Sequence, residues 1–106
     1  MGRVLKTQKE RRIKFTSLVP ALIEHTVALG YDPAIAFVKR CQECPIGLKK
    51  SLHKDCCAID LDLYDKDGDY ITFGEAHRPI GAYWESLHPQ CRWGGRFRDG
   101  NHYEFV

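Results

Sequence analysis

The pattern of apolar and polar positions predicts one long helix in the first third of the chain. From Phe15 to Leu29 apolar residues recur at roughly helical spacing. Thr16 or Ser17 can cap the start of this helix, which places Pro20 in the first turn, where proline is tolerated. Gly30 follows the last periodic residue, as is typical of a helix end. We therefore expect the main helix at 15–29.

Period-two alternation predicts the strands. Cys56–Tyr64 alternates in part and is expected to be a central strand. The Asp-Gly turn at 65–69 should lead into a returning strand at Tyr70–Phe73, which makes a hairpin. His102–Phe105 reads as a short final strand.

The remaining segments are short. After a turn at Asp32-Pro33, the stretch that ends at Val38 is either extended or helical, and Pro79–Leu87 is expected to form a second helix. Trp93-Gly94-Gly95 predicts a loop. These elements indicate an α+β fold, in which a small, mainly antiparallel sheet packs against helices.

Length and charge exclude some classes of protein. The 106 residues suffice for one domain, 1–106, with one core. A formal net charge of +2 lacks the strongly basic surface of nucleic-acid-binding proteins. Segment 1–14 is basic and is expected to be a solvated first helical turn or a frayed terminus, with binding to an anionic surface as the alternative. No segment predicts a signal peptide or membrane insertion, so we expect synthesis in the cytoplasm.

The five cysteines do not predict a disulfide framework, because their number is odd and no signal peptide is visible. Cys41-x-x-Cys44 could form half of a structural zinc site or a redox pair. The second half would be Cys56-Cys57, whose adjacency matches zinc ribbons poorly. We expect unpaired, partly buried thiols instead.

Three residues of metal-ligand type stand out: His53, Asp60 and His102. Two imidazoles and one carboxylate are a common catalytic zinc set, with a fourth position left for water. Asp99 lies three residues before His102 and could accept a proton from that water. A carboxylate in an apolar strand is also costly to bury without a partner, which favours a site at Asp60. Glu104 is either a partner of a ligand histidine or a solvent-facing strand residue.

The spacing Ser51-x-His53-x6-Asp60, followed by Asp99-x2-His102 and preceded by Arg40, resembles the D-alanyl-D-alanine peptidase group of zinc peptidases. The stretches Gly81–Leu87 and Trp93–Phe97 are similar to its short phage members, which are endolysins. The resemblance covers roughly 15–105. The chain departs from it in having Cys41 where threonine is usual, and two cysteines ahead of Asp60.

The resemblance implies a Hedgehog/DD-peptidase-like fold and a role for each matching residue. His53, Asp60 and His102 would be the ligands of Zn²⁺, and Asp99 the catalytic general base. Arg40 would bind a substrate carboxylate or polarise the scissile carbonyl, although a salt bridge would also explain it. The other two substrate-binding positions would be Ser51, which positions its loop, and Trp93, which shapes the floor of the cleft.

The resemblance also implies a function. The expected substrate is the peptide stem of bacterial peptidoglycan, cut between L-Ala and D-Glu or between D-Ala and D-Ala. A phage endolysin would act as a monomer, would stay in the cytoplasm of the infected host until its release to the cell wall, and would need a separate holin-type partner. Two alternatives remain: a catalytically silent metal- or wall-binding module on the same fold, and a zinc-finger-like protein that uses Cys41, Cys44, Cys56 and Cys57.

Overall fold

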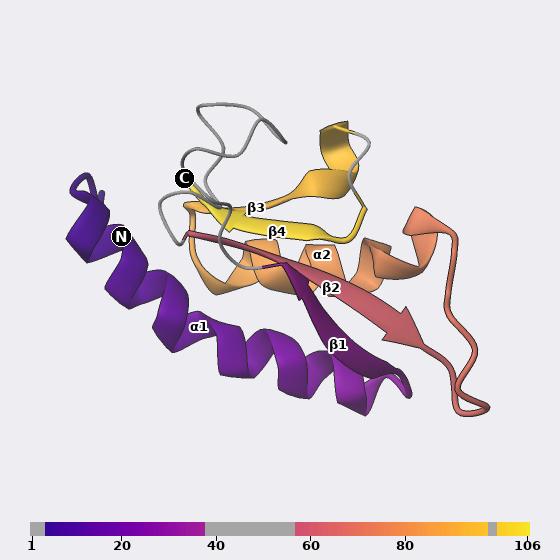
Figure 1. The fold of residues 1–106 in the computed structure, drawn as a ribbon. Helices are drawn as coiled ribbons and strands as arrows, with labels where there is room; N and C mark the ends of the chain where they lie inside the picture. Colours follow the sequence, from indigo (N-terminus) through magenta and orange to yellow (C-terminus); the bar gives the residue numbers. More distant parts are fainter. Residues whose placement is uncertain (1–3, 38–56, 98–99) are drawn as a thin grey trace, which may run out of the picture.

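The computed structural model describes residues 4–37, 57–97 and 100–106. Two helices and a four-stranded antiparallel sheet form a compact α+β domain (Figure 1). The sheet order is β1-β2-β4-β3. The α-helices and strands are α1 (Gln8–Ala28), β1 (Asp32–Phe37), β2 (Ala58–Tyr64), α2 (Arg78–Leu87), β3 (Cys91–Trp93) and β4 (His102–Phe105), with short 3₁₀ turns η1 (Gly74–His77) and η2 (Gly94–Phe97). The expected fold class is confirmed at this level.

Helix α1 begins seven residues earlier than the sequence analysis predicts. Its cap is Thr7, whose side chain accepts a hydrogen bond from the Glu10 backbone, while the Glu10 side chain accepts one from the Thr7 backbone. This reciprocal pair satisfies two of the backbone donors that a helix start leaves open. The expected cap at Thr16 or Ser17 is therefore wrong, and Pro20 lies inside the helix. Part of the basic segment 1–14 is helical rather than frayed, because the helix already includes 8–14.

Strand β2 is central, as expected, and its alternation divides the sheet into two faces. Ile59, Leu61 and Leu63 are at most 2% exposed, and so are Tyr103 and Phe105 of β4. These side chains share one apolar cluster with residues of both helices, namely Phe15 and Leu22 of α1 and Ile80 and Trp84 of α2. Since successive side chains of a strand point to opposite faces, Asp60, His102 and Glu104 lie on the other face. We call the first the helix face and the second the polar face.

The second helix, α2, lies where the sequence analysis predicts it, with its start one residue earlier. Pro79 lies at the helix start, where its missing N–H costs nothing, and Trp84 is fully buried. The Trp84 indole Nε1 donates to the Glu104 backbone oxygen at 3.0 Å, which ties α2 to β4. Helix α2 therefore fixes the position of the strand that carries His102 and Glu104.

Three predictions for the strands and loops need correction. The hairpin is wrong beyond its turn, because Tyr70 makes only an isolated bridge to Tyr64 and 71–73 form no strand. The predicted turn at Asp32-Pro33 is wrong, because both residues belong to β1, while the extended alternative for the rest of this stretch is confirmed by the antiparallel pairing of β1 with β2. Trp93, expected in a loop, ends β3, and the glycines after it begin η2. Among the described residues, no helix is long and apolar enough to cross a membrane.

Candidate metal centre

Two of the three predicted metal ligands meet on the polar face. Asp60 of β2 and His102 of β4 are directly paired positions of neighbouring antiparallel strands. The His102 Nδ1 lies 3.0 Å from Asp60 Oδ1, and the histidine is only 6% exposed. Strand register thus joins positions 42 residues apart, so the two side chains meet, and their role as zinc ligands stays a prediction.

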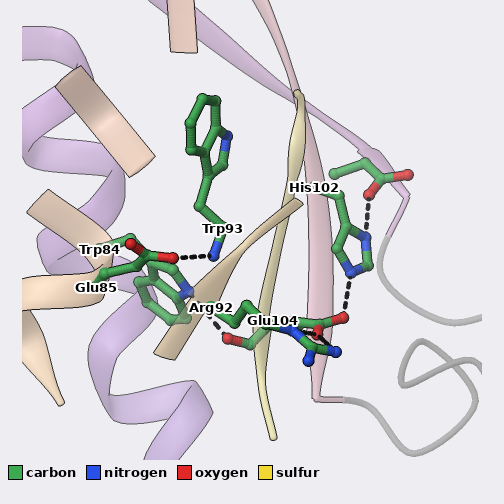
Figure 2. A network of polar contacts seen from close by, with 7 residues as sticks. Trp84, Glu85, Arg92, Trp93, His102 and Glu104 are labelled. Carbon is green, nitrogen blue, oxygen red and sulfur yellow. Dashed lines mark hydrogen bonds and ion pairs between the residues drawn. The ribbon is translucent and has the colours of Figure 1, made fainter. Parts of the chain in front are cut away.

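Glu104 approaches His102 from the other edge of the imidazole ring. His102 Nε2 donates to Glu104 Oε1 at 2.6 Å, and the glutamate is 5% exposed (Figure 2). Of the two roles left open for Glu104, the solvent-facing one is wrong. The residue is a buried hydrogen-bond partner of the histidine.

The two carboxylates raise the basicity of His102. Burial alone would lower the pKa of the imidazole, but the hydrogen bonds to Asp60 and Glu104, together with their charges, raise it to about 9. Burial likewise acts to raise the pKa of Glu104, and the contacts with His102 and Arg92 more than offset this and hold it below its usual value. In the metal-free protein an imidazolium therefore lies between two carboxylates.

Arg92 completes this row of charges and was not singled out from the sequence. It lies opposite Glu104 in the β3–β4 pairing, and its guanidinium binds Glu104 Oε2 through Nε and Nη2 (Figure 2). The alternation of Cys91, Arg92 and Trp93 is the signal that could have found it, but it spans only three residues and precedes two glycines. Because a loop was predicted at this position, the pairing of Arg92 with Glu104 was not predicted.

The other predicted site residues lie outside the described residues: Arg40, Ser51, His53 and Asp99. Within 4–37, 57–97 and 100–106, no three His, Cys, Asp or Glu side chains gather as a metal-binding group. The reason is geometric, since Asp60 and Glu104 contact opposite edges of the His102 ring and cannot converge on one ion. The described part of the chain thus contains two of the three predicted ligands, Asp60 and His102, and the third, His53, lies outside it.

The Asp60–His102 pair fits zinc in both chemistry and spacing. Carboxylate oxygen and neutral imidazole nitrogen are normal zinc donors, and two ligands of one tetrahedral ion lie about 3.4 Å apart. The 3.0 Å between Asp60 Oδ1 and His102 Nδ1 is close to this separation. A small opening of the pair would therefore place both atoms on one ion, with loss of the proton on Nδ1.

Trp93 is a structural residue that also lines a hollow. Its side chain is 4% exposed, and its indole Nε1 donates to the Gly100 backbone oxygen at 2.7 Å. Gly81 and Gly95 lie so close to the ring that a Cβ at either position would collide with it. The ring forms part of the wall of a hollow of ≈ 310 Å³, together with Gly74, Glu75, Gly95 and Gly100. Trp93 therefore lines a hollow, and its predicted role in shaping the floor of a substrate cleft stays a prediction.

A second hollow, of ≈ 270 Å³, adjoins the first at Gly74 and Gly100. It extends to His77 and to Asn101, the residue before His102. Tyr70 and Phe73 line it as well, and their side chains are more than half exposed. The described surface beside the histidine strand is therefore hollowed.

The three other described histidines pack against aromatic rings. His77 is 4% exposed and its Nδ1 shares a hydrogen bond of 2.6 Å with the Tyr103 hydroxyl. His88 packs against Phe105, and His25 stacks on Tyr83 at 3.9 Å between ring centres. None of the three contacts the Asp60–His102 pair through a described hydrogen bond.

The cysteines that the structure describes are buried. Cys57 precedes β2, and Cys91 begins β3 without forming a disulfide. Burial raises the pKa of the Cys91 thiol to about 12, which keeps it protonated at neutral pH. The other three cysteines of the alternative zinc-finger set lie outside the described residues: Cys41, Cys44 and Cys56.

A comparison with known proteins finds no matching family model and no matching curated relative. The geometry of the candidate site therefore has to support a functional assignment without a relative.

Proposed function

We propose that this chain is a zinc-dependent peptidase that hydrolyses the peptide stems of bacterial peptidoglycan, on a Hedgehog/DD-peptidase-like fold. The observation that carries the proposal is the Asp60–His102 pair, 3.0 Å apart on neighbouring strands and largely shielded from solvent. Strand register thus brings the partly buried Asp60 carboxylate and the buried His102 imidazole together, and both are donor groups that zinc accepts. The order of the residues along the chain fits the zinc peptidase motif.

Asp60 and His102 would hold the metal from β2 and β4, and His53 would supply the third ligand. Zinc held in this way supplies Lewis-acid polarisation and makes water a competent nucleophile at neutral pH. A rigid sheet suits this task, because paired backbone positions keep the two ligands close together before the ion arrives.

The chemistry of amide hydrolysis assigns the other roles. Asp99 would take a proton from the attacking water and give it to the leaving amine, as a carboxylate within hydrogen-bond reach can do. Arg40 would stabilise the negative charge that develops on the carbonyl oxygen, or bind a substrate carboxylate. Ser51 would hold the loop that carries His53.

The hollows beside β4 support a peptide substrate. They share Gly74 and Gly100 and reach the residue before His102, so an extended chain could lie across them toward the metal. Trp93 would support this floor from beneath. The bond cleaved is either L-Ala–D-Glu or D-Ala–D-Ala.

We further propose a lytic role as a phage endolysin. In this role the protein would act as a monomer on peptidoglycan, from the cytoplasm of the infected host, after a separate holin-type protein opens the membrane. Neither nucleic acid nor insertion into the membrane has a part in it.

The test is the release of new amino termini from purified peptidoglycan, followed by mass spectrometry with and without a chelator. Chelator-sensitive release is expected, and the fragment masses would identify the bond. Asp99→Asn should lose this activity while it retains zinc. A matched control is Asp62→Asn, which alters a carboxylate of the same strand and face as Asp60 that pairs with Ala34 instead of His102.

Two outcomes would contradict the proposal. Zinc binding without release from several types of cell wall would favour the silent metal- or wall-binding module. Full activity of Asp99→Asn would contradict the general-base role.

A further inference from the structure

Four charged or ionisable side chains form a continuous row across the polar face. Strand register places Asp60 opposite His102, and Arg92 opposite Glu104. His102 and Glu104 are two residues apart on β4, so their side chains share one face of the sheet. The order Asp60, His102, Glu104, Arg92 is therefore built into the backbone pairing of three strands.

The two ring nitrogens of His102 face different partners. Nε2 is 2.6 Å from Glu104 Oε1, and Nδ1 is 3.0 Å from Asp60 Oδ1. An ionised carboxylate can only accept a hydrogen bond, so the nitrogen that faces Glu104 carries a proton. A metal that replaces the Nδ1 proton would then lie on the Asp60 edge of the ring.

Glu104 itself is held at both oxygens. Oε1 accepts from His102, and Oε2 is bound by the Arg92 guanidinium (Figure 2). The Glu104 side chain is 6% exposed, whereas that of Arg92 is 51% exposed, so the guanidinium closes the row at the surface. With each oxygen occupied by a different partner, the carboxylate cannot rotate without breaking a charged contact.

The backbone of Glu104 is fixed as well. Its carbonyl oxygen accepts the Trp84 indole N–H at 3.0 Å, and Trp84 is fully buried in the core. The position of the Glu104 carboxylate is thus determined from the surface by Arg92 and from the core by Trp84. Glu104 thus has more contacts than a residue of an isolated surface ion pair, which would contribute little to stability.

We propose that Glu104 is a positioning residue, which holds the His102 ring with Nδ1 toward Asp60 for a shared metal ion, and that Arg92 anchors Glu104 in this role. The inference rests on the proposed zinc site. A carboxylate behind a ligand histidine fixes its tautomer and orientation, and loss of such a partner weakens metal affinity roughly 10- to 100-fold.

The experiment measures zinc affinity of the full chain by competition with a chromophoric chelator. Glu104→Gln keeps the shape of the side chain but removes its charge, and its amide can also donate to Nε2. We expect its zinc affinity to fall roughly 10- to 100-fold. Arg92→Lys keeps the charge but removes the fork of donors, and it should weaken affinity by a smaller factor.

A matched control is Glu85→Gln. Glu85 is also a partly buried carboxylate, and it accepts a hydrogen bond from the Trp93 backbone at 3.0 Å, but no described hydrogen bond joins it to His102 (Figure 2). Its zinc affinity should stay within about twofold of wild type, since its described hydrogen bond is to the Trp93 backbone and not to His102 or Asp60. Circular dichroism of all variants verifies that they are folded.

A second readout separates positioning from simple stabilisation. Long-range ¹H–¹⁵N correlation spectra of the zinc-loaded protein identify the ring nitrogen of His102 that binds the ion. We expect Nδ1 in wild type, in Glu85→Gln and in Arg92→Lys, and a mixture of Nδ1 and Nε2 in Glu104→Gln.

Unchanged affinity and pure Nδ1 binding in Glu104→Gln would overturn the positioning role, and so would Nε2 as the bound nitrogen in wild type. A failure of the proposed peptidase function would give a different set of results. Wild type would bind zinc through Nδ1 and respond to Glu104→Gln, yet release nothing from peptidoglycan.

Discussion

His77 and His102 are both buried, at 4% and 6% exposure, yet their pKa values move in opposite directions. Burial lowers the pKa of His77 to about 4, and the charge of Asp62 offsets this only in part. His102 has its pKa raised to about 9, because its carboxylate partners outweigh the effect of burial. His77 contacts the Tyr103 hydroxyl of the helix face, whereas His102 lies on the polar face.

The difference shows that the two faces of the sheet carry different kinds of residue: apolar side chains that stabilise the fold on one face, and charged side chains of the candidate site on the other. Alternate residues of β2 and β4 bury apolar side chains against α1 and α2, or present charged ones on the opposite face. On the helix side, burial lowers the pKa of His77 more than the charge of Asp62 raises it, so the imidazole is neutral at pH 7. The polar face surrounds His102 with carboxylates, which are also the groups that can bind a cation. We therefore expect substitutions on the helix face to affect stability and those on the polar face to affect metal binding.

The largest expected effect is the loss of a core side chain on the helix face. Leu61 is fully buried, and Leu61→Ala should lower the free energy of unfolding by about 2–5 kcal/mol, because it leaves a cavity. Urea denaturation followed by circular dichroism measures this. Ile35→Ala is the control, since Ile35 is 58% exposed and should cost much less. Equal losses in the two variants would show that the described core is not what stabilises the fold.

The stability of the protein should fall at acid pH because His77 is neutral in the folded state. His77 has a folded pKa of about 4 against 6.5 for the unfolded chain, so the unfolded state binds the proton first as the pH falls. Its contribution to stability is complete above pH 6.5 and is lost progressively as the pH falls to about 4, in total up to about 3 kcal/mol. His77→Gln should remove this part of the pH dependence. Identical pH slopes for the two proteins would contradict a neutral His77.

Packing around Trp93 tests how rigid the helix side is. Alanine inside a helix normally stabilises it relative to glycine, but a Cβ at Gly81 would collide with the Trp93 ring. Gly81→Ala should therefore destabilise the protein by about 1–3 kcal/mol, as overpacking does. Gly74→Ala is the control, because its Cβ would meet Gly100 at an ordinary 3.5 Å. A thermal melt that shows Gly81→Ala as stable as wild type would mean that the ring can move aside.

The smallest expected change in stability is on the polar face. Asp60→Asn in the metal-free protein keeps an acceptor for His102 and should cost about 1 kcal/mol, the value of a typical hydrogen bond. Its neighbour Leu61 points to the opposite face, so the two variants compare the faces at adjacent positions. If Asp60→Asn cost as much as Leu61→Ala in urea denaturation, the separation of stability from chemistry would fail.

The elements that sequence predicts best are those with a clear period. Alternation found β2 and β4, and with them the Asp60–His102 pair, because both strands have one apolar face. Helix α2 was predicted at Pro79–Leu87, one residue short of its observed start at Arg78. In these segments local pattern and tertiary burial agree.

The sequence predictions were wrong in segments whose structure depends on tertiary contacts more than on the local residue pattern. The first turns of α1 contain few apolar residues, although Thr7-x-x-Glu10 is a capping-box signal that could have placed the start. Strand β3 has three residues before two glycines, so its pairing with β4, and with it the contact between Arg92 and Glu104, could not be read locally. The predicted strand at 70–73 is reduced to a bridge between Tyr70 and Tyr64 and a backbone hydrogen bond from Ile71 to Leu63, and Phe73 is 61% exposed.

The most direct test of a zinc site on the polar face is the zinc content of the chain after equilibrium dialysis, measured by atomic emission. We expect one zinc ion per wild-type chain. His102→Ala and His53→Ala should each lose the ion, whereas the double variant Cys41→Ser, Cys44→Ser should retain it. The opposite pattern, in which zinc survives His102→Ala but is lost with the two cysteines, would contradict this expectation and would place the metal in a cysteine site.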